Sequence, residues 1–267
     1  MLQKQTENSN RFTEMSCETY AQRDCDNYNQ SMGTLEGYDC PECKNRGRMM
    51  VVRDGYPIVK YCKCMEIRNT MQRLKSSGLK DLIENYTFER FKVQSEWQRK
   101  AKAKAIEFLK DHENKWFFMG GQVGCGKTHL CTALVLEFIK AGNAAHYMLW
   151  RDEIVPLKAS IMDEEAYEKA VRKLKEIKVL YIDDFFKTER GKTPTTSEIN
   201  ITFEILNYRY NNRDLVTIIS SEWLIDDIIG IDEAVGSRIY ERSIRHCLVI
   251  PYDNSKNYRL NGGVNCE

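Results

Sequence analysis

A glycine-rich loop at residues 121–128, with the sequence GQVGCGKT, most constrains how this chain of 267 residues can fold. It matches G-x-x-x-x-G-K-[ST] at every fixed position and lies between an apolar segment at 115–119 and a helical pattern at 127–141. A strand, a tight loop and a helix in this order form a cradle for phosphate, because successive backbone N–H groups face the oxygens and the helix N-terminus adds positive charge. The loop therefore predicts a nucleoside triphosphate site, here for ATP; an accidental glycine-rich turn is the alternative.

The side chains of this loop have distinct expected roles. Lys127 would reach the β- and γ-phosphates, and the hydroxyl of Thr128 would coordinate Mg²⁺. Cys125 is expected to be a tolerated small residue inside the loop. The predicted nucleotide contacts here are Gly121, Gln122, Val123, Gly124, Cys125, Gly126, Lys127, Thr128 and His129.

Two carboxylates follow an apolar segment further along the chain. Residues 179–182, with the sequence VLYI, run directly into Asp183 and Asp184. Acids at the carboxyl end of a buried parallel strand lie where ligands bind in such sheets. We expect Asp183 to bind Mg²⁺, directly or through water, and Asp184 to orient the attacking water or accept its proton. Two solvated acids that cap a strand are the alternative.

Strand and helix patterns alternate through most of the chain. A helix is expected at 95–112, and Gly142 closes the helix that follows the loop. This alternation predicts an α/β domain of three layers, αβα, in which helices cover both faces of a parallel sheet. The strands are expected at 115–119, 144–149, 179–182, 215–219 and 246–250, and the remaining helices at 151–162, 163–176, from a loop at 187–196 to about 211, 223–229 and 232–242.

Two further polar features would lie near a bound nucleotide. Ser221 and Glu222 follow the strand at 215–219, where they could position the water or sense the γ-phosphate. Arg238, on the helix at 232–242, could stabilise transition-state charge on the nucleotide of a neighbouring subunit. Surface arginines on an amphipathic helix are the alternative.

Four of the ten cysteines form two close pairs, Cys40-Pro-Glu-Cys43 and Cys62-Lys-Cys64. Residues between the pairs alternate around Asp54-Gly55, which predicts a hairpin. Tetrahedral Zn²⁺ sites use two short turns that each aim two thiolates at one point, and a module this small needs such a staple. We therefore expect a zinc-ribbon-like module, with free core cysteines as the alternative. The predicted ligands are Cys40, Cys43, Cys62 and Cys64.

Composition excludes some classes of protein. No apolar run approaches the ~20 residues that a membrane span needs, and the N-terminus lacks the hydrophobic stretch of a secretory signal. We expect a cytoplasmic protein without a membrane partner, in which cysteines stay reduced. The formal net charge is +1, but residues 40–80 carry ten basic against three acidic residues, and residues 1–36 carry three against six. The basic segment is a candidate for contact with phosphate.

These features divide the chain into five expected parts. The segment at 66–84 looks helical, with a break at Ser76-Ser77-Gly78. The parts are a flexible or partner-ordered arm at 1–36, a zinc-binding module at 37–66, a helical linker at 67–94, the P-loop domain at 95–251 and a tail at 252–267.

Four motifs together resemble a known group of AAA+ ATPases. The loop GQVGCGKTH, the acidic motif LYIDDFFK, the strand end TIISSE and the run GSRIYER are similar to those of the DnaC/DnaI/IstB type. The segment YTFERF and the four-cysteine module resemble DnaI-type and phage-type replicative helicase loaders, so the resemblance covers about residues 38–250. It implies a protein that hydrolyses ATP between the subunits of a homo-oligomer, holds single-stranded DNA and places a hexameric replicative helicase on it.

The resemblance also implies roles for individual residues. Arg238 matches the arginine finger, and Ser221 with Glu222 falls at the sensor-1 position, where Glu222 departs from the usual Asn or Asp. A sensor-2 arginine has two weak candidates, Arg242 and Arg245. The aromatic residues expected near the adenine are Tyr86, Phe88 and Phe91. Candidate DNA contacts in the insertion after the second strand are Lys158, Arg172, Lys173 and Lys175; a solvated charged face is their alternative.

Two other functions fit the same motifs. An IstB-like transposition helper would use its ATPase to deliver a transposase to target DNA. The zinc module favours the loader, because the simplest transposition helpers begin closer to the ATPase domain. A zinc-containing nucleic-acid-binding protein could instead use ATP as a switch with little turnover. Co-purification of a replicative helicase, and ATP hydrolysis measured with and without single-stranded DNA, separate the three.

Overall fold

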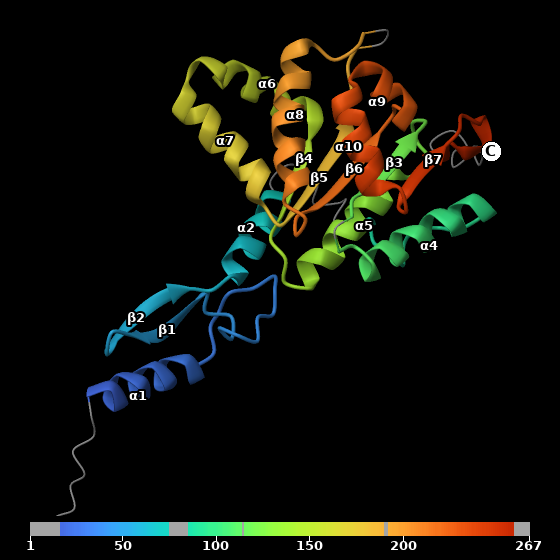
Figure 1. The fold of residues 1–267 in the computed structure, drawn as a ribbon. Coiled ribbons are helices and arrows are strands. Elements are labelled where there is room, and N and C mark those ends of the chain that lie inside the picture. Colours follow the sequence, from blue (N-terminus) through green and yellow to red (C-terminus); the bar gives the residue numbers. More distant parts are fainter. Residues whose placement is uncertain (1–16, 75–84, 114, 190–191, 259–267) are drawn as a thin grey trace, which may run out of the picture. The chain divides into compact units, whose positions relative to one another are not determined.

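The computed structural model describes residues 17–74, 85–113, 115–189 and 192–258. The chain forms two compact units that divide between Met65 and Glu66. Figure 1 shows the larger unit as a sheet flanked by helices and the smaller one as a hairpin with a helix beside it.

A five-stranded parallel sheet forms the centre of the larger unit, with the strand order β4-β5-β6-β3-β7. The strand order differs from the order along the chain, because the crossover after β3 leads to β4 at the far edge of the sheet. The chain then returns through β5 and β6 toward β3. The strands are β3 (Phe117–Gly121), β4 (Ala145–Leu149), β5 (Val179–Phe185), β6 (Val216–Ser221) and β7 (Cys247–Ile250).

Helices cover both faces of this sheet, which confirms the expected three-layer αβα fold (Figure 1). One layer contains α4 (Glu96–Lys110) and α5 (Lys127–Lys140), which pack together. Right-handed crossovers that run in opposite directions along a parallel sheet lie on opposite faces, so the later helices form the other layer. They are α6 (Trp150–Ala159), the short helix η2 (Ser160–Met162), α7 (Glu164–Glu176), α8 (Thr196–Asn211), α9 (Ile225–Ile231) and α10 (Glu233–Ser243).

Three strands extend past their expected carboxyl ends. Strand β6 continues to Ser221, two residues beyond the expected end. Strand β3 continues to Gly121, because the backbone at Gly120 and Gly121 still pairs with the neighbouring strands. Strand β5 continues past the acids to Phe185, with an irregular register between Ile182 and Phe185. These extensions place residues of the predicted site within the strands, at the carboxyl end of the sheet. A last short helix, η3 (Asn254–Lys256), follows β7.

The smaller unit contains the expected hairpin. Strands β1 (Arg48–Arg53) and β2 (Tyr56–Tyr61) pair antiparallel around Asp54 and Gly55, whose φ values of 53° and 80° suit a tight two-residue turn. The helix α2 (Cys64–Leu74) begins at the last cysteine of the module. The expected break at 76–78 lies outside the described residues.

A helix, α1 (Cys17–Gln30), occupies much of the segment expected to be a flexible or partner-ordered arm. It packs against β1, and the Asn29 side chain pairs with the backbone of Met50, donating to its oxygen at 2.8 Å and accepting from its N–H at 3.0 Å. In the structure, this helix therefore contacts the hairpin of the same chain. Residues 1–16 of the expected arm lie outside the described residues.

Candidate functional site

The glycine loop joins β3 to α5 and wraps around the ammonium group of its own lysine. Gly124 and Gly126 have φ values of 78° and 88°, a region that favours glycine, and Gly126 caps the N-terminus of α5. Lys127 Nζ donates to the carbonyl oxygens of Gly121 and Gln122, both at 2.8 Å. The loop therefore presents a helix N-terminus and one buried ammonium group, the combination that binds phosphate.

Asp183 lies at the centre of a hydrogen-bond network. Its buried carboxylate accepts from the Thr128 hydroxyl at 3.3 Å, from the Tyr147 hydroxyl at 2.8 Å and from the Ser220 hydroxyl. Burial, and then the charge of Asp183, raise the pKa of Tyr147, so this phenol remains a donor. A carboxylate and a hydroxyl side by side are oxygen ligands of the kind that Mg²⁺ prefers.

The second acid, Asp184, pairs with a lysine that the sequence analysis missed. Lys187 Nζ lies 3.2 Å from Asp184 Oδ2 and also pairs with the carboxylate of Glu222, at the end of β6. Burial lowers the pKa of Lys187, but the hydrogen bond that its ammonium group donates to Glu222 and the charge of Asp184 outweigh this effect, and the net pKa is raised. The lysine therefore carries its charge across a wide pH range.

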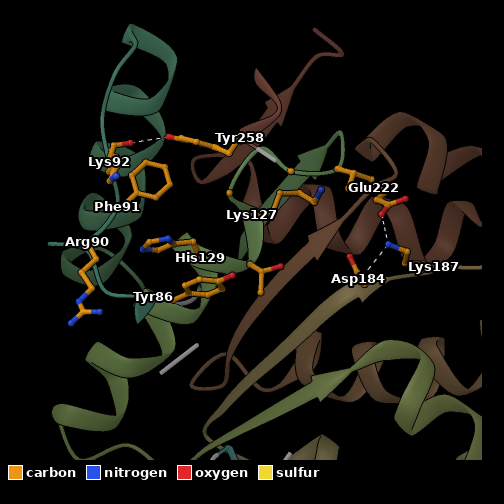
Figure 2. Close-up of a pocket in the computed structure, with 14 residues that line it drawn as sticks. Tyr86, Arg90, Phe91, Lys92, Lys127, His129, Asp184, Lys187, Glu222 and Tyr258 are labelled. Carbon is orange, nitrogen blue, oxygen red and sulfur yellow. Dashed lines mark hydrogen bonds and ion pairs between the residues drawn. The ribbon is translucent and has the colours of Figure 1, made fainter. Parts of the chain in front are cut away.

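A cavity of about 330 Å³ opens over the loop, within the size range of small-molecule sites (Figure 2). One end carries the aromatic residues, and the other carries Lys187, Asp184 and Glu222. A nucleotide placed with its phosphates on the loop would direct its base toward the aromatic end. The lining residues are Tyr86, Arg90, Phe91, Lys92, Val123, Gly124, Gly126, Lys127, Thr128, His129, Asp184, Lys187, Glu222 and Tyr258.

Aromatic rings from three parts of the chain meet at the base end. Tyr86 stacks on His129 with centroids 4.7 Å apart, and Phe91 meets His129 edge-on at 5.1 Å. Burial lowers the pKa of His129, which favours the neutral ring; its Nε2 lies 2.8 Å from the carbonyl oxygen of Thr87. Tyr258 closes this end: its hydroxyl donates to the Lys92 oxygen at 2.8 Å.

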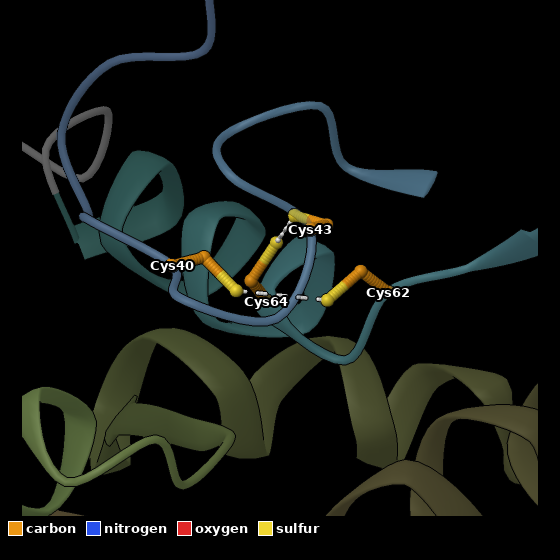
Figure 3. A group of neighbouring side chains, drawn as sticks. All are labelled: Cys40, Cys43, Cys62 and Cys64. Atoms are coloured by element: carbon orange, nitrogen blue, oxygen red, sulfur yellow. Dashed lines mark hydrogen bonds between the residues drawn. The ribbon is translucent and has the colours of Figure 1, made fainter. Parts of the chain in front are cut away.

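The four predicted zinc ligands lie together in the smaller unit (Figure 3). All four are buried, and their sulfur atoms lie within 4.8 Å of one another. Burial raises the pKa of Cys43, whereas the Gly47 N–H and the neighbouring thiols lower it, with a net value of about 7. A cluster of this kind could hold one tetrahedral metal ion.

Comparison with known proteins decides the family. Residues 59–264 match the family model of the IstB-like ATP binding protein. The chain belongs to this family. The phage-like element PBSX protein XkdC of Bacillus subtilis is 30% identical over 236 residues, which cover 84% of this chain and 87% of XkdC. The replicative helicase loader DnaC of Escherichia coli is 26% identical over 125 residues, 46% of this chain and 50% of DnaC.

Solved structures support the AAA+ fold of this IstB-like chain. The crystal structure of DnaI superposes with a TM-score of 0.52 at 20% identity, over 64% of this chain and 93% of DnaI. The DnaC helicase loader gives a TM-score of 0.52 at 21% identity, over 64% and 98% of the two chains. The resemblance inferred from the four motifs is thus confirmed at the level of a DnaC/IstB-like AAA+ ATPase. None of the helices that the structure describes has the length and apolar character needed to cross a membrane.

Several predicted nucleotide contacts of this IstB-like site do not line the cavity. Cys125 is fully buried, and the Gln122 side chain pairs with the backbone of Asp253. Of the three aromatic residues expected near the adenine, Tyr86 and Phe91 line the cavity, whereas Phe88 is buried and does not line it. The predicted contacts that do line the cavity are Val123, Gly124, Gly126, Lys127, Thr128, His129, Asp184 and Glu222.

Ser221 does not line the cavity. Its hydroxyl donates to the Phe185 oxygen at 2.7 Å and accepts from the Trp223 N–H at 3.0 Å, so it faces away from the cavity. Its neighbour Ser220 reaches Asp183, because successive side chains of a strand point to opposite faces.

Arg238 lies outside the cavity of its own chain. Its guanidinium donates to Asn207 Oδ1 at 3.1 Å and to the Ala234 oxygen at 2.8 Å, and it packs 4.9 Å from the Phe203 ring centroid. Any contact with a nucleotide would therefore be made with another subunit.

Proposed function

We propose that this protein is an ATP-hydrolysing helicase loader that acts in the cytoplasm and places a replicative hexameric helicase on single-stranded DNA. The single observation that carries the ATPase part is the contact between Thr128, which lines the cavity with Lys127, and the buried carboxylate of Asp183. The loading part is supported by the similarity to DnaC and to the DnaI fold.

The hydrolysis step assigns a task to each group at the charged end. Lys127 binds the β- and γ-phosphates, and Thr128 with Asp183 would hold Mg²⁺, which supplies charge neutralisation when bound. Asp184 orients the attacking water and accepts its proton. The new bond forms between the water oxygen and the γ-phosphorus as the bond to the β–γ bridging oxygen breaks, and ADP leaves with that electron pair.

The arginine finger is proposed to act between subunits, with Arg238 as the candidate. In that case the Arg238→Ala and Asp184→Asn proteins are each inactive. A mixture of the two regains activity, because at some interfaces the Asp184→Asn subunit supplies Arg238 and the Arg238→Ala subunit supplies Asp184. Arg242→Ala is the matched comparison, since Arg242 is buried 5.8 Å from the Trp116 ring centroid. Rescue by Arg242→Ala and not by Arg238→Ala would assign the finger to Arg242.

The basic residues proposed to bind DNA in the insertion between β4 and β5 already form ion pairs with acidic residues of the same chain. Lys158 pairs with Glu198, and Arg172 and Lys175 also pair with glutamates. DNA phosphates would have to displace these partners. The salt dependence of single-stranded DNA binding by Lys158→Ala and Arg172→Ala variants tests whether they do.

The decisive experiment for loading is co-purification of the full chain with a replicative helicase, followed by helicase-dependent unwinding of coated single-stranded DNA. ATP hydrolysis without helicase binding would contradict the loader. A transposition helper is the second candidate, favoured by the family description and by 24% identity over 147 residues to the insertion sequence IS232 putative ATP-binding protein of Bacillus thuringiensis. Capture of a transposase in the same experiment would support it.

We also propose that the cysteine cluster holds one Zn²⁺. The support is the donor set: four buried sulfur atoms close to one another, one pair from the segment before the hairpin and one pair from the segment after it. The metal would take the place of the large core that this small unit lacks.

A further inference from the structure

Lys187 connects two acids that end neighbouring strands. Asp184 follows the buried part of β5, and Glu222 follows β6. The ammonium group lies 3.2 Å from Asp184 Oδ2 and within contact of Glu222 Oε1, and all three side chains are about one-third exposed to the cavity side. Figure 2 shows this chain of charges facing Lys127 across the cavity. Among the described residues, neither acid has another ion-pair partner.

We propose that Lys187 is a positioning residue for ATP hydrolysis. Glu222 holds its ammonium group, and the ammonium group holds the carboxylate of Asp184 at the phosphate end of the cavity. The inference rests on the proposed ATPase activity. It also replaces the role expected for Glu222, which becomes an anchor for Lys187 and not a direct sensor of the γ-phosphate.

The backbone supports this assignment. Asp184 and Phe186 have φ values of 52° and 58°, a region that residues with side chains rarely adopt. The chain thereby turns back, and the Lys187 N–H donates to the Asp184 oxygen at 2.9 Å. The turn brings the lysine beside the acid that lies three positions earlier. Strained backbone at this point persists only where the surroundings fix it, and the two ion pairs of Lys187 provide such contacts.

The chemistry of the site explains why a cation is needed here. Asp184 must keep a fixed orientation to accept the proton of the attacking water, and a misplacement of about 1 Å is costly in such a step. Without Lys187, two carboxylates would face each other and the triphosphate with no cation between them. Lys187 itself gains or loses no proton during the reaction; it keeps its charge throughout.

Three single variants of the full chain test the inference by steady-state ATP hydrolysis. In Lys187→Met, kcat should fall about 10- to 100-fold, with a smaller change in KM, because orientation is lost while the phosphate cradle remains. Lys187→Arg should recover most of that loss, since a guanidinium can also bridge two carboxylates. Lys192→Met is the matched control: this lysine lies on the same loop and pairs with Glu189 in an exposed ion pair. It should match the wild type.

The combination with Glu222→Gln distinguishes an anchor from a sensor. If Glu222 acts only through Lys187, Glu222→Gln lowers kcat by itself but adds no further loss in the Lys187→Met background. Losses that multiply in the double variant, or wild-type kcat in Lys187→Met, overturn the inference. Absence of hydrolysis by the wild-type protein instead overturns the proposed ATPase activity, so the two failures are distinguishable. Thermal unfolding of each variant checks that the fold is retained.

Discussion

The hydroxyl of Thr128 lies 3.3 Å from the carboxylate of Asp183, although 55 positions separate the two residues. One begins α5 and the other lies near the end of β5, so the contact joins the phosphate loop to the acidic strand. This contact depends on the strand order, in which only β6 separates β5 from β3. It also depends on α5, which packs against both β3 and β5. The sheet order thus assembles the pair of oxygen ligands.

Asp183→Asn should weaken the use of Mg²⁺ while nucleotide binding persists. The amide keeps the size of the side chain but removes the negative charge that attracts the cation. We expect the Mg²⁺ concentration for half-maximal hydrolysis to rise at least about 10-fold. Asp163→Asn, at the N-terminus of α7, is the control. An unchanged Mg²⁺ titration would contradict the assignment of Asp183.

Lys127→Ala should abolish high-affinity nucleotide binding. The variant loses charge-assisted hydrogen bonds to phosphate, and affinity should fall at least about 10- to 100-fold. Binding of a fluorescent ATP analogue measures the effect. The control is Lys140→Ala at the other end of α5, where the lysine forms an exposed ion pair with Glu137. Retained affinity in Lys127→Ala would remove the basis of the phosphate-site assignment.

The purified protein should contain one zinc ion per chain, and Cys40→Ser should lose it. Metal binding supplies most of the folding free energy of a small module, on the order of 10 kcal/mol for structural zinc. The variant should therefore become sensitive to protease between residues 30 and 65, while the P-loop domain stays intact. Cys247→Ser, in strand β7 of the larger unit, is the control. A metal-free protein whose hairpin resists protease would rule out a structural zinc site.

Contiguous motifs made much of the site predictable from sequence. The loop at 121–128 and the acids after 179–182 carry their chemistry in neighbouring residues, and both lie where expected. The sequence analysis named Ser221, but alternation in a strand says only that neighbours face opposite sides, not which one faces the acids. In the structure Ser220 donates to Asp183, and Ser221 donates to the Phe185 oxygen.

Other contacts depend on geometry that no sequence pattern carries. Lys187 reaches Asp184 because two residues with side chains adopt positive φ, which sequence rules assign to glycine or asparagine. Tyr258 and Lys92 are 166 positions apart, and only the completed sheet brings them together. The polar sequence of α1 left a flexible or partner-ordered arm open, because its contact with β1 is made through the side chain of Asn29 and not through an apolar pattern.

Arg209→Met should destabilise the P-loop domain strongly. Arg209 is fully buried on α8 and donates to Thr217 Oγ1 and to four backbone oxygens, those of Leu174, Lys175, Ile177 and Val216. Methionine fills the space but leaves these acceptors unpaired, and each buried unpaired group costs ~1–3 kcal/mol. Urea unfolding should show a loss of at least about 3 kcal/mol. Arg172→Met, at an exposed ion pair, should change stability by less than about 0.5 kcal/mol.

His246 should make the P-loop domain sensitive to mild acid. Its ring is fully buried against Phe108, and neither ring nitrogen has a hydrogen-bond partner in the described part of the chain. Burial lowers its pKa; Glu107 and Asp111 raise it, and Lys104 and Lys115 lower it, with a net value below the usual 6.5.

The sign of the effect follows from proton binding in the two states. Below pH 6.5 the unfolded chain protonates this histidine before the folded chain does, so stability that is present above pH 6.5 is lost as the pH falls. The contribution is at most about 1.4 kcal/mol per pH unit. His246→Phe removes the titrating group and keeps an aromatic ring against Phe108, so its free energy of unfolding should decline less steeply between pH 7 and pH 5. Urea unfolding at several pH values measures both slopes. Parallel curves would mean that His246 is protonated equally in the folded and unfolded states.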